Sequence, residues 1–212
     1  MSDIAHHIPE PILAAYAAGS LPRVFEVVVA THISMCDSCR GALAAHEALG
    51  GTVLEGLAEA PVSDTLLAGV MDRLDYAQPD AAPAPKREGI YPGPVMAALK
   101  SRPPRWKSLG FGVKQAILEA GDDGSLRLLH IPPGRAVPDH GHNGLELTLV
   151  LQGSFSDETG AFGVGDLEVA DGDLEHTPTA GEEAPCICLA ATDAPLRFQS
   201  LVPRLLQPLF KI

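Results

Sequence analysis

Residues 32–39 read HISMCDSC and bring one histidine and two cysteines into eight positions of a chain that has only four cysteines. His32 and Cys36 are four residues apart, which places both on one face at the end of a predicted helix. Cys36 and Cys39 form a CxxC knuckle at the start of the next helix, a spacing typical of zinc ligands. This stretch therefore predicts a helical unit organised around a metal ion.

A structural zinc site requires a fourth ligand, and two histidines near the start of the chain can supply it. His6 and His7 are the candidates, and His7 is preferred because it lies nearer the first predicted helix. A redox-active CxxC pair is an alternative, although that motif normally follows a strand in a βαβ unit and no such unit is predicted here. Burial of the two cysteines as apolar side chains is the other alternative.

The sequence around the CxxC stretch has the pattern of four short helices. Apolar residues recur at helical spacing, Gly19 ends the first helix, and Gly50 and Gly51 end the third. Four such helices bury only a thin core, which a structural metal ion would stabilise. The predicted helices cover residues 10–18, 21–35, 39–49 and 64–76 of an N-terminal domain, residues 1–78.

Proline and glycine are dense after this domain, so residues 79–105 are predicted to be a linker, in which VMAALK can form one helical turn. The rest of the chain changes to short alternating runs between turns, the pattern of a jelly-roll β-barrel. The runs span residues 113–120, 126–133, 145–153, 167–173, 186–192 and 196–200 of a C-terminal domain, residues 106–212. The predicted fold class is therefore multidomain α plus β.

A second group of ligand types lies in residues 134–153, GRAVPDHGHNGLELTLVLQG. His140 and His142 share a strand face, and Glu146 can reach the same point from the neighbouring strand. His176, which follows an acidic turn, is the fourth candidate. Three nitrogens and one carboxylate suit zinc, iron, manganese or nickel, so the ligand types alone leave the metal open.

Charge and composition restrict the class of protein. Hydrophobic residues make up 46% of the chain, but no apolar run is long enough for a membrane span and no leader sequence is recognised. The predicted location is cytoplasmic, where cysteines stay reduced. The net charge of −12 is divided into −8 over residues 1–80, +4 over residues 81–105 and −8 over residues 106–212. Acidic surfaces of this kind repel nucleic acid and favour a basic protein partner; acidity that serves solubility alone is the alternative.

The helical half resembles the zinc-binding anti-sigma domain, which combines an N-terminal histidine with the pattern His32-x3-Cys36-x2-Cys39. In that family the helices hold an extracytoplasmic-function (ECF) sigma factor away from core RNA polymerase. The resemblance implies that His7, His32, Cys36 and Cys39 bind zinc.

The second half resembles the cupins. The first cupin motif, G-x5-H-x-H-x3-E-x6-G, is matched at every fixed position, namely Gly134, His140, His142, Glu146 and Gly153. The second motif is kept in part, with Gly165 and His176 at the expected spacing but Asp171, Asp173 and Ala180 in place of the usual Pro, Gly and Asn. The resemblance implies a second divalent metal ion, with zinc as the expected one, bound by His140, His142, Glu146 and His176.

Taken together, the two domains and the linker resemble the ChrR group of anti-sigma factors over essentially the whole chain. This resemblance implies a negative regulator, not an enzyme, that binds an ECF sigma factor and releases it on singlet oxygen or related oxidative stress. It implies that the N-terminal domain binds the sigma factor and that the C-terminal domain is needed for release. Direct contact with nucleic acid or with a membrane is not expected.

Two other functions stay open at the level of sequence. One is a metal-dependent cupin enzyme, a dioxygenase or isomerase, with a helical docking domain. The other is a structural zinc module that tethers an oligomer. Cys186 and Cys188 share a strand face and are expected to be buried apolar residues. A redox-responsive pair and sulfur ligands near the metal site are the alternatives.

Overall fold

The computed structural model describes residues 4–74, 83–141, 143–172, 174–195 and 197–198. The first half of the chain forms helices α1 (Glu10–Ala17), α2 (Arg23–Met35), α3 (Asp37–Glu55) and α4 (Leu66–Leu74), and α5 (Gly93–Ala98) follows in the segment expected to be a linker. The four predicted helices and the turn in VMAALK are therefore present. The expected end of the fourth helix, residues 75–76, lies outside the described residues, as do residues 79–82 of the expected linker.

Helix α3 is longer than predicted. It continues through Gly50 and Gly51 to Glu55, although both glycines were expected to end it. Neither glycine adopts a positive φ. A glycine inside a helix costs only about 1 kcal/mol, so it ends a helix only where the chain uses its left-handed conformation.

The second half of the chain is a double layer of antiparallel strands, as predicted. Six strands form the larger sheet in the order β1-β2-β3-β11-β5-β8, and two sheets of three strands, β10-β6-β7 and β12-β4-β9, close the other side. The strands are β1 (Lys107–Gly110), β2 (Val113–Gly121), β3 (Gly124–Ile131), β4 (His140–Gly141), β5 (Glu146–Gln152), β6 (Phe155–Ser156), β7 (Ala161–Phe162), β8 (Leu167–Ala170), β9 (Glu175–His176), β10 (Thr179–Ala180), β11 (Cys186–Thr192) and β12 (Arg197–Phe198).

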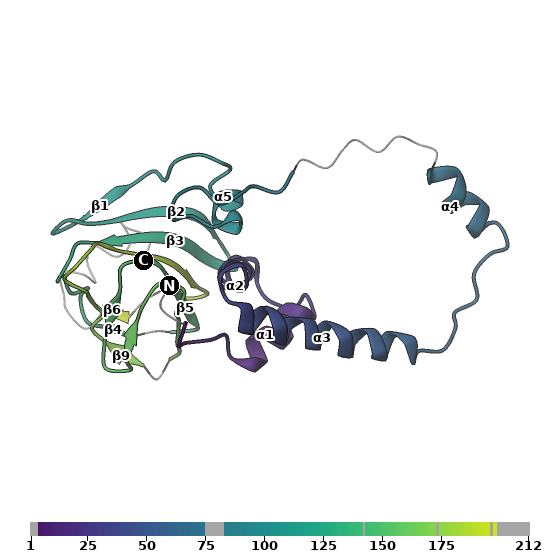
Figure 1. Ribbon diagram of the computed structural model, residues 1–212, viewed down its shortest axis with the longest axis horizontal. Helices are drawn as coiled ribbons and strands as arrows, with labels where there is room; N and C mark the ends of the chain where they lie inside the picture. The colour runs from purple at the N-terminus through teal and green to yellow at the C-terminus, as the bar shows by residue number, and fades with distance from the viewer. Residues whose placement is uncertain (1–3, 75–82, 142, 173, 196, 199–212) are drawn as a thin grey trace.

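The helices and the large sheet share one hydrophobic core. Figure 1 shows α2 and α5 lying against this sheet, and the core joins Phe25 and Val28 of α2 to Leu149 of β5 and Leu189 of β11. The run of β-branched residues in α2 is helical because the helix buries seven residues, which outweighs their weak helix propensity. The thin helical core expected from the sequence is thus completed by the outer face of the sheet.

Helix α3 and helix α4 extend away from this core. Figure 1 shows the second half of α3 projecting from the body and α4 standing apart from it. Cys39 is the one buried residue of α3, and α4 has none. Large apolar side chains on this arm are exposed, namely Leu49, Val53, Leu54, Leu57, Val62, Leu66, Leu67, Val70, Met71 and Leu74. Among the described helices, none is both long and apolar enough to span a bilayer.

Candidate metal centres

The histidine and cysteines of residues 32–39 meet His7 at the junction of α2 and α3. One ligand atom from each of His7, His32, Cys36 and Cys39 lies within 4.8 Å of all the others. His32 Nε2 is 3.3 Å from Cys39 Sγ, and His7 Nδ1 is 3.4 Å from Cys36 Sγ and 3.7 Å from Cys39 Sγ. The edges of a zinc tetrahedron with nitrogen and sulfur ligands measure roughly 3.4 to 3.8 Å. The four side chains therefore fit a tetrahedral ion.

The local backbone explains this convergence. His32 lies in the last turn of α2, and its carbonyl accepts a hydrogen bond from the Cys36 N–H at 2.8 Å. Cys36 has an extended backbone and is both the last cap of α2 and the first cap of α3, where the Cys39 N–H points at its sulfur at 3.4 Å. A single residue thus joins the helices, and the CxxC spacing turns both sulfurs to one side.

The chemistry of the donors also suits a metal ion. His32, Cys36 and Cys39 are buried, whereas His7 is exposed. Burial, helped by the charge of His7, lowers the pKa of His32 to about 4, which keeps the imidazole neutral and able to bind a metal. Burial raises the pKa of the Cys39 thiol, so a metal ion must displace its proton on binding.

His6, the other sequence candidate, lies outside this cluster. Its Nδ1 is 3.6 Å from Asp166 Oδ2, and its ring packs at a tilt against Phe162 of the β-sheet domain, with ring centroids 4.4 Å apart. The structure therefore brings His7, and not His6, to the CxxC knuckle.

A second cluster lies where β4 and β9 pair. His140 is opposite His176 in the register of these strands, and their Nε2 atoms are 3.2 Å apart. His176 Nδ1 donates to Asp157 Oδ2 at 2.6 Å, and His140 Nδ1 donates to the Pro138 carbonyl at 2.9 Å. With both Nδ1 atoms acting as donors, the two facing Nε2 atoms can share a proton or bind a metal ion. This arrangement fits a divalent metal held by both Nε2 atoms.

Asp157 and Glu168 complete the second cluster, and the sequence analysis missed both. Glu168 Oε1 lies 3.2 Å from His176 Nδ1. Burial lowers the pKa of His176, but Glu168 and Asp157 outweigh burial and raise this pKa to about 9. Burial raises the pKa of Glu168 to about 7. The available signal was the alternation in β8, because Leu167 and Val169 pack towards the helices and leave Glu168 on the inner face.

The remaining predicted cupin residues are placed as follows. His142 lies outside the described residues. Glu146 begins β5, and its Oε1 accepts a hydrogen bond from the Thr148 hydroxyl at 2.9 Å. The expected four-residue set His140, His142, Glu146 and His176 therefore stays a prediction, of which the structure brings the first and last together.

Cys186 and Cys188 are free thiols in the inner core, with their sulfurs 3.4 Å apart. The hydrogen bond with Cys186, together with burial, raises the pKa of Cys188 well above its ordinary value. A buried thiol with a raised pKa is a poor nucleophile, which favours the expected role as apolar core residues over that of a reactive pair.

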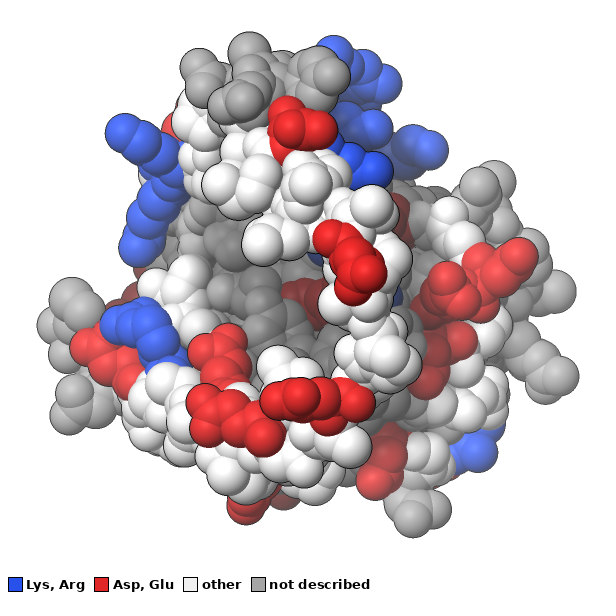
Figure 2. All heavy atoms as spheres, turned by 90° about the vertical axis from the view of Figure 1, so that its right-hand side faces the viewer, with Lys and Arg blue, Asp and Glu red and all other residues white. Residues whose placement is uncertain are grey.

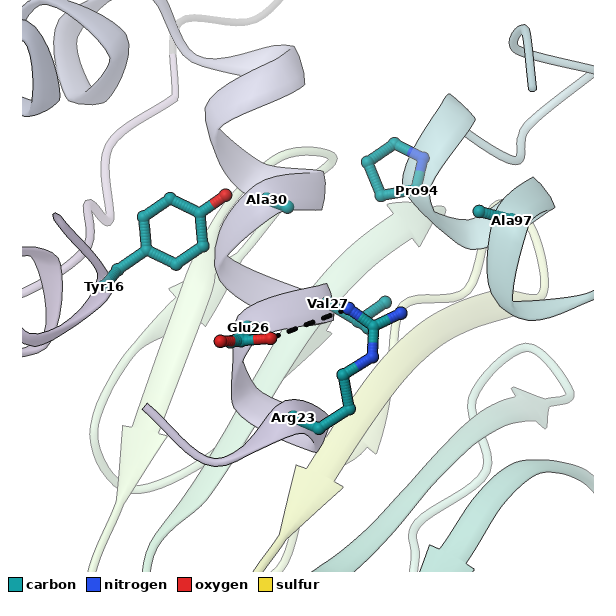
Figure 3. A pocket seen from close by; sticks show the side chains of 7 residues that line it. All are labelled: Tyr16, Arg23, Glu26, Val27, Ala30, Pro94 and Ala97. Carbon is teal, nitrogen blue, oxygen red and sulfur yellow. Dashed lines mark ion pairs between the residues drawn. The ribbon is translucent and has the colours of Figure 1, made fainter. Parts of the chain in front are cut away.

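A pocket between α1, α2 and α5 is separate from both clusters. It is lined by Tyr16 of α1, by Pro94 and Ala97 of α5, and by residues of the first half of α2, as Figure 3 shows. Arg23 and Glu26, one turn apart on α2, both line the pocket and form an ion pair at 3.6 Å. His32 and Cys36 lie at the other end of α2.

Replacement of Asp157 by alanine is expected to weaken metal binding at the second cluster by about 10-fold or more, because His176 loses the carboxylate that orients it. The measurement is a zinc competition titration with a chelator, in a Cys36→Ser/Cys39→Ser background that leaves one cluster intact. Glu183→Ala, which removes an exposed carboxylate, is the control and should not change the affinity. An Asp157→Ala chain with unchanged affinity would contradict the positioning role.

Known proteins match both halves of the chain. The model of the ChrR cupin-like domain family matches residues 96–195. The anti-sigma-E factor ChrR of Cereibacter sphaeroides is 53% identical over 211 residues, which are 99% of each chain. A crystal structure of Rhodobacter sphaeroides SigE in complex with the anti-sigma ChrR superposes with a TM-score of 0.80 at 50% identity, covering 90% of this chain and 99% of that one.

These matches decide between the functions that the sequence left open. A relative of this identity, aligned over its whole length and named as an anti-sigma factor, makes the chain a regulator rather than a metal-dependent cupin enzyme. The cupin resemblance of the second half is confirmed by the family match. The chain belongs to the ChrR family of anti-sigma factors.

Proposed function

We propose that this protein binds an ECF sigma factor in the cytoplasm, keeps it from core RNA polymerase, and releases it on singlet oxygen or related oxidative stress. The single observation that carries the binding half of this proposal is the apolar arm formed by α3 and α4. The observations that support the release half are the second cluster in the β-sheet domain and the core that this domain shares with α2.

The apolar arm has the properties of a docking surface. Its exposed apolar residues include Leu67 at 72%, Leu74 at 70% and Leu54 at 69%. Large apolar side chains that gather on an exposed surface often mark a site of protein–protein interaction. We therefore assign the arm, residues 49–74, to the sigma factor.

Helix α4 has the shape of a recognition helix. Leu67, Val70, Met71 and Leu74 follow the spacing i, i+3, i+4 and i+7, which places them on one face. A helix of nine residues is only marginally stable in water by itself, so a partner groove that buries this face would also stabilise the helix.

Charge on the arm complements a basic partner. Residues 42–74 contain five acidic residues and one basic residue. Figure 2 shows the end of the molecule that carries the arm, with acidic side chains along the lower part of this face. Acidic side chains around an apolar face steer a basic protein towards that face and help to set the orientation of the complex.

The metal sites have separate roles in this proposal. Zinc held by His7, His32, Cys36 and Cys39 would fix α3 against α2 and so set the direction of the arm. A divalent metal at His140, His142, Glu146 and His176 would act as the site that responds to oxidants. Release then requires two states of the chain with different affinities for the sigma factor.

Isolation of the tagged protein from its native cells tests the proposed partner. We expect a stoichiometric sigma factor to co-purify, and we expect it to be lost when a chelator removes the metal from the CxxC knuckle. Absence of any sigma factor from the untreated sample would refute the proposal.

A further inference from the structure

Asp166, in the turn between β7 and β8, holds the segment that carries His7. One carboxylate oxygen accepts hydrogen bonds from the backbone N–H groups of Ala5 at 2.7 Å and His6 at 2.8 Å. The other oxygen accepts from the Gly163 N–H at 2.8 Å. The side chain is 9% exposed. A carboxylate that accepts three backbone hydrogen bonds holds the donating backbone segments strongly and in a defined geometry.

Other contacts hold the same segment to the same turn. The Leu167 N–H donates to the His6 carbonyl at 3.2 Å, and the His6 ring lies on Phe162. The side chain of Ile4 covers Gly165, where an added Cβ would come within 2.6 Å of Ile4 Cδ1. Residues 4–6 are therefore bound to the β-sheet domain through backbone and side chains.

His7 follows this segment directly, and Ile8 behind it is buried. The other three cluster residues lie at the junction of α2 and α3, with His32 in α2, Cys36 between the helices and Cys39 in α3. The chain is thus fixed on both sides of His7, by Asp166 before it and by the buried Ile8 after it.

We infer that Asp166 of the cupin-like domain is a positioning residue for the N-terminal metal site, because it holds residues 5 and 6 so that His7 completes the ligand set. This inference rests on the proposed metal site at His7, His32, Cys36 and Cys39. One residue separates Asp166 from Glu168, which contacts His176, so this turn connects the surroundings of the two clusters.

Cobalt substitution of the full chain tests the inference. Thiolate ligands give Co²⁺ a sulfur-to-metal charge-transfer absorption, which reports Cys36 and Cys39 and not the nitrogen and oxygen donors described at the second cluster. Titration with Co²⁺ should show that Asp166→Ala weakens binding at the thiolate site by about 10- to 100-fold. His7→Ala should weaken it to a similar degree. Asp166→Asn keeps an oxygen that can accept from Ala5 and His6, so its affinity should lie between those of Asp166→Ala and the unchanged chain.

The double variant separates positioning from general destabilisation. If Asp166 acts through His7, Asp166→Ala combined with His7→Ala should bind Co²⁺ no more weakly than His7→Ala alone. Asp122→Ala, in the exposed β2–β3 turn, is the control and should bind like the unchanged chain. The inference would be overturned if the losses of Co²⁺ affinity of the two single variants added in the double variant. It would also be overturned if Asp166→Ala left the affinity unchanged. An unchanged chain without the charge-transfer absorption would overturn the metal site itself, and the inference with it.

Discussion

A chain carrying Leu67→Asp and Val70→Asp is expected to bind the sigma factor more weakly, by roughly 100-fold or more. Both residues lie on the apolar face of α4, and each change would place a charge without a partner in the buried centre of the interface. The measurement is a calorimetric or fluorescence titration of the purified chain with its cognate sigma factor. Loss of inhibition in a transcription assay with core RNA polymerase should accompany the loss of affinity.

The fold should survive these changes, because α4 contributes no buried residue to it. The circular dichroism spectrum and the melting temperature are therefore expected to match those of the unchanged chain. Phe111→Asp is the matched control, since Phe111 is an exposed apolar residue, 86% accessible, in the β1–β2 turn. If Phe111→Asp weakened binding as much as the pair in α4, the assignment of the arm to the sigma factor would be wrong.

Replacement of Cys36 and Cys39 by serine is expected to release α3 while leaving α2 and the sheet folded. Cys39 is the one buried residue of α3, so the metal knuckle is the main attachment of that helix, whereas α2 buries seven residues. Hydrogen exchange of the full chain should show amides of α3 losing protection by more than about 100-fold, because loss of a structural metal removes several kcal/mol. Affinity for the sigma factor should fall with it, because the arm begins in α3.

The control for this experiment uses the other two cysteines. Cys186→Ala and Cys188→Ala remove thiols from the inner core of the β-sheet domain and should leave exchange in α3 unchanged. If the amides of α3 were as well protected in the metal-free Cys36→Ser/Cys39→Ser chain as in the unchanged chain, a structural role for the metal would be contradicted.

The site at the CxxC knuckle could be predicted from the sequence because its geometry is local. His32, Cys36 and Cys39 lie on two consecutive helices joined by one residue, so their spacing along the chain nearly determines their spacing in space. The choice between His6 and His7 was not local. It depends on Asp166, 160 residues further along the chain, which fixes the backbone of His6. No pattern within the first ten residues records that contact.

The surroundings of His176 and the shared core were missed for related reasons. Asp157 occurs in the sequence SDETG, which reads as an ordinary polar turn, and only the fold brings it to His176. The apolar residues of α2 have the same appearance whether they pack on other helices or on a sheet. Hydrophobic pattern therefore predicted the elements, but not that helices and sheet would share one core.

Transcription with reconstituted components tests the central claim most directly. Core RNA polymerase, the cognate sigma factor and this protein are mixed, and run-off transcript is measured in the dark and during generation of singlet oxygen by an illuminated photosensitiser. We expect full inhibition in the dark at one protein per sigma factor and recovery of transcription on illumination. Recovery should be absent with His140→Ala/Glu146→Ala. Transcription in the dark would contradict the account. Recovery on illumination that is as large with the double variant as with the unchanged chain would also contradict it.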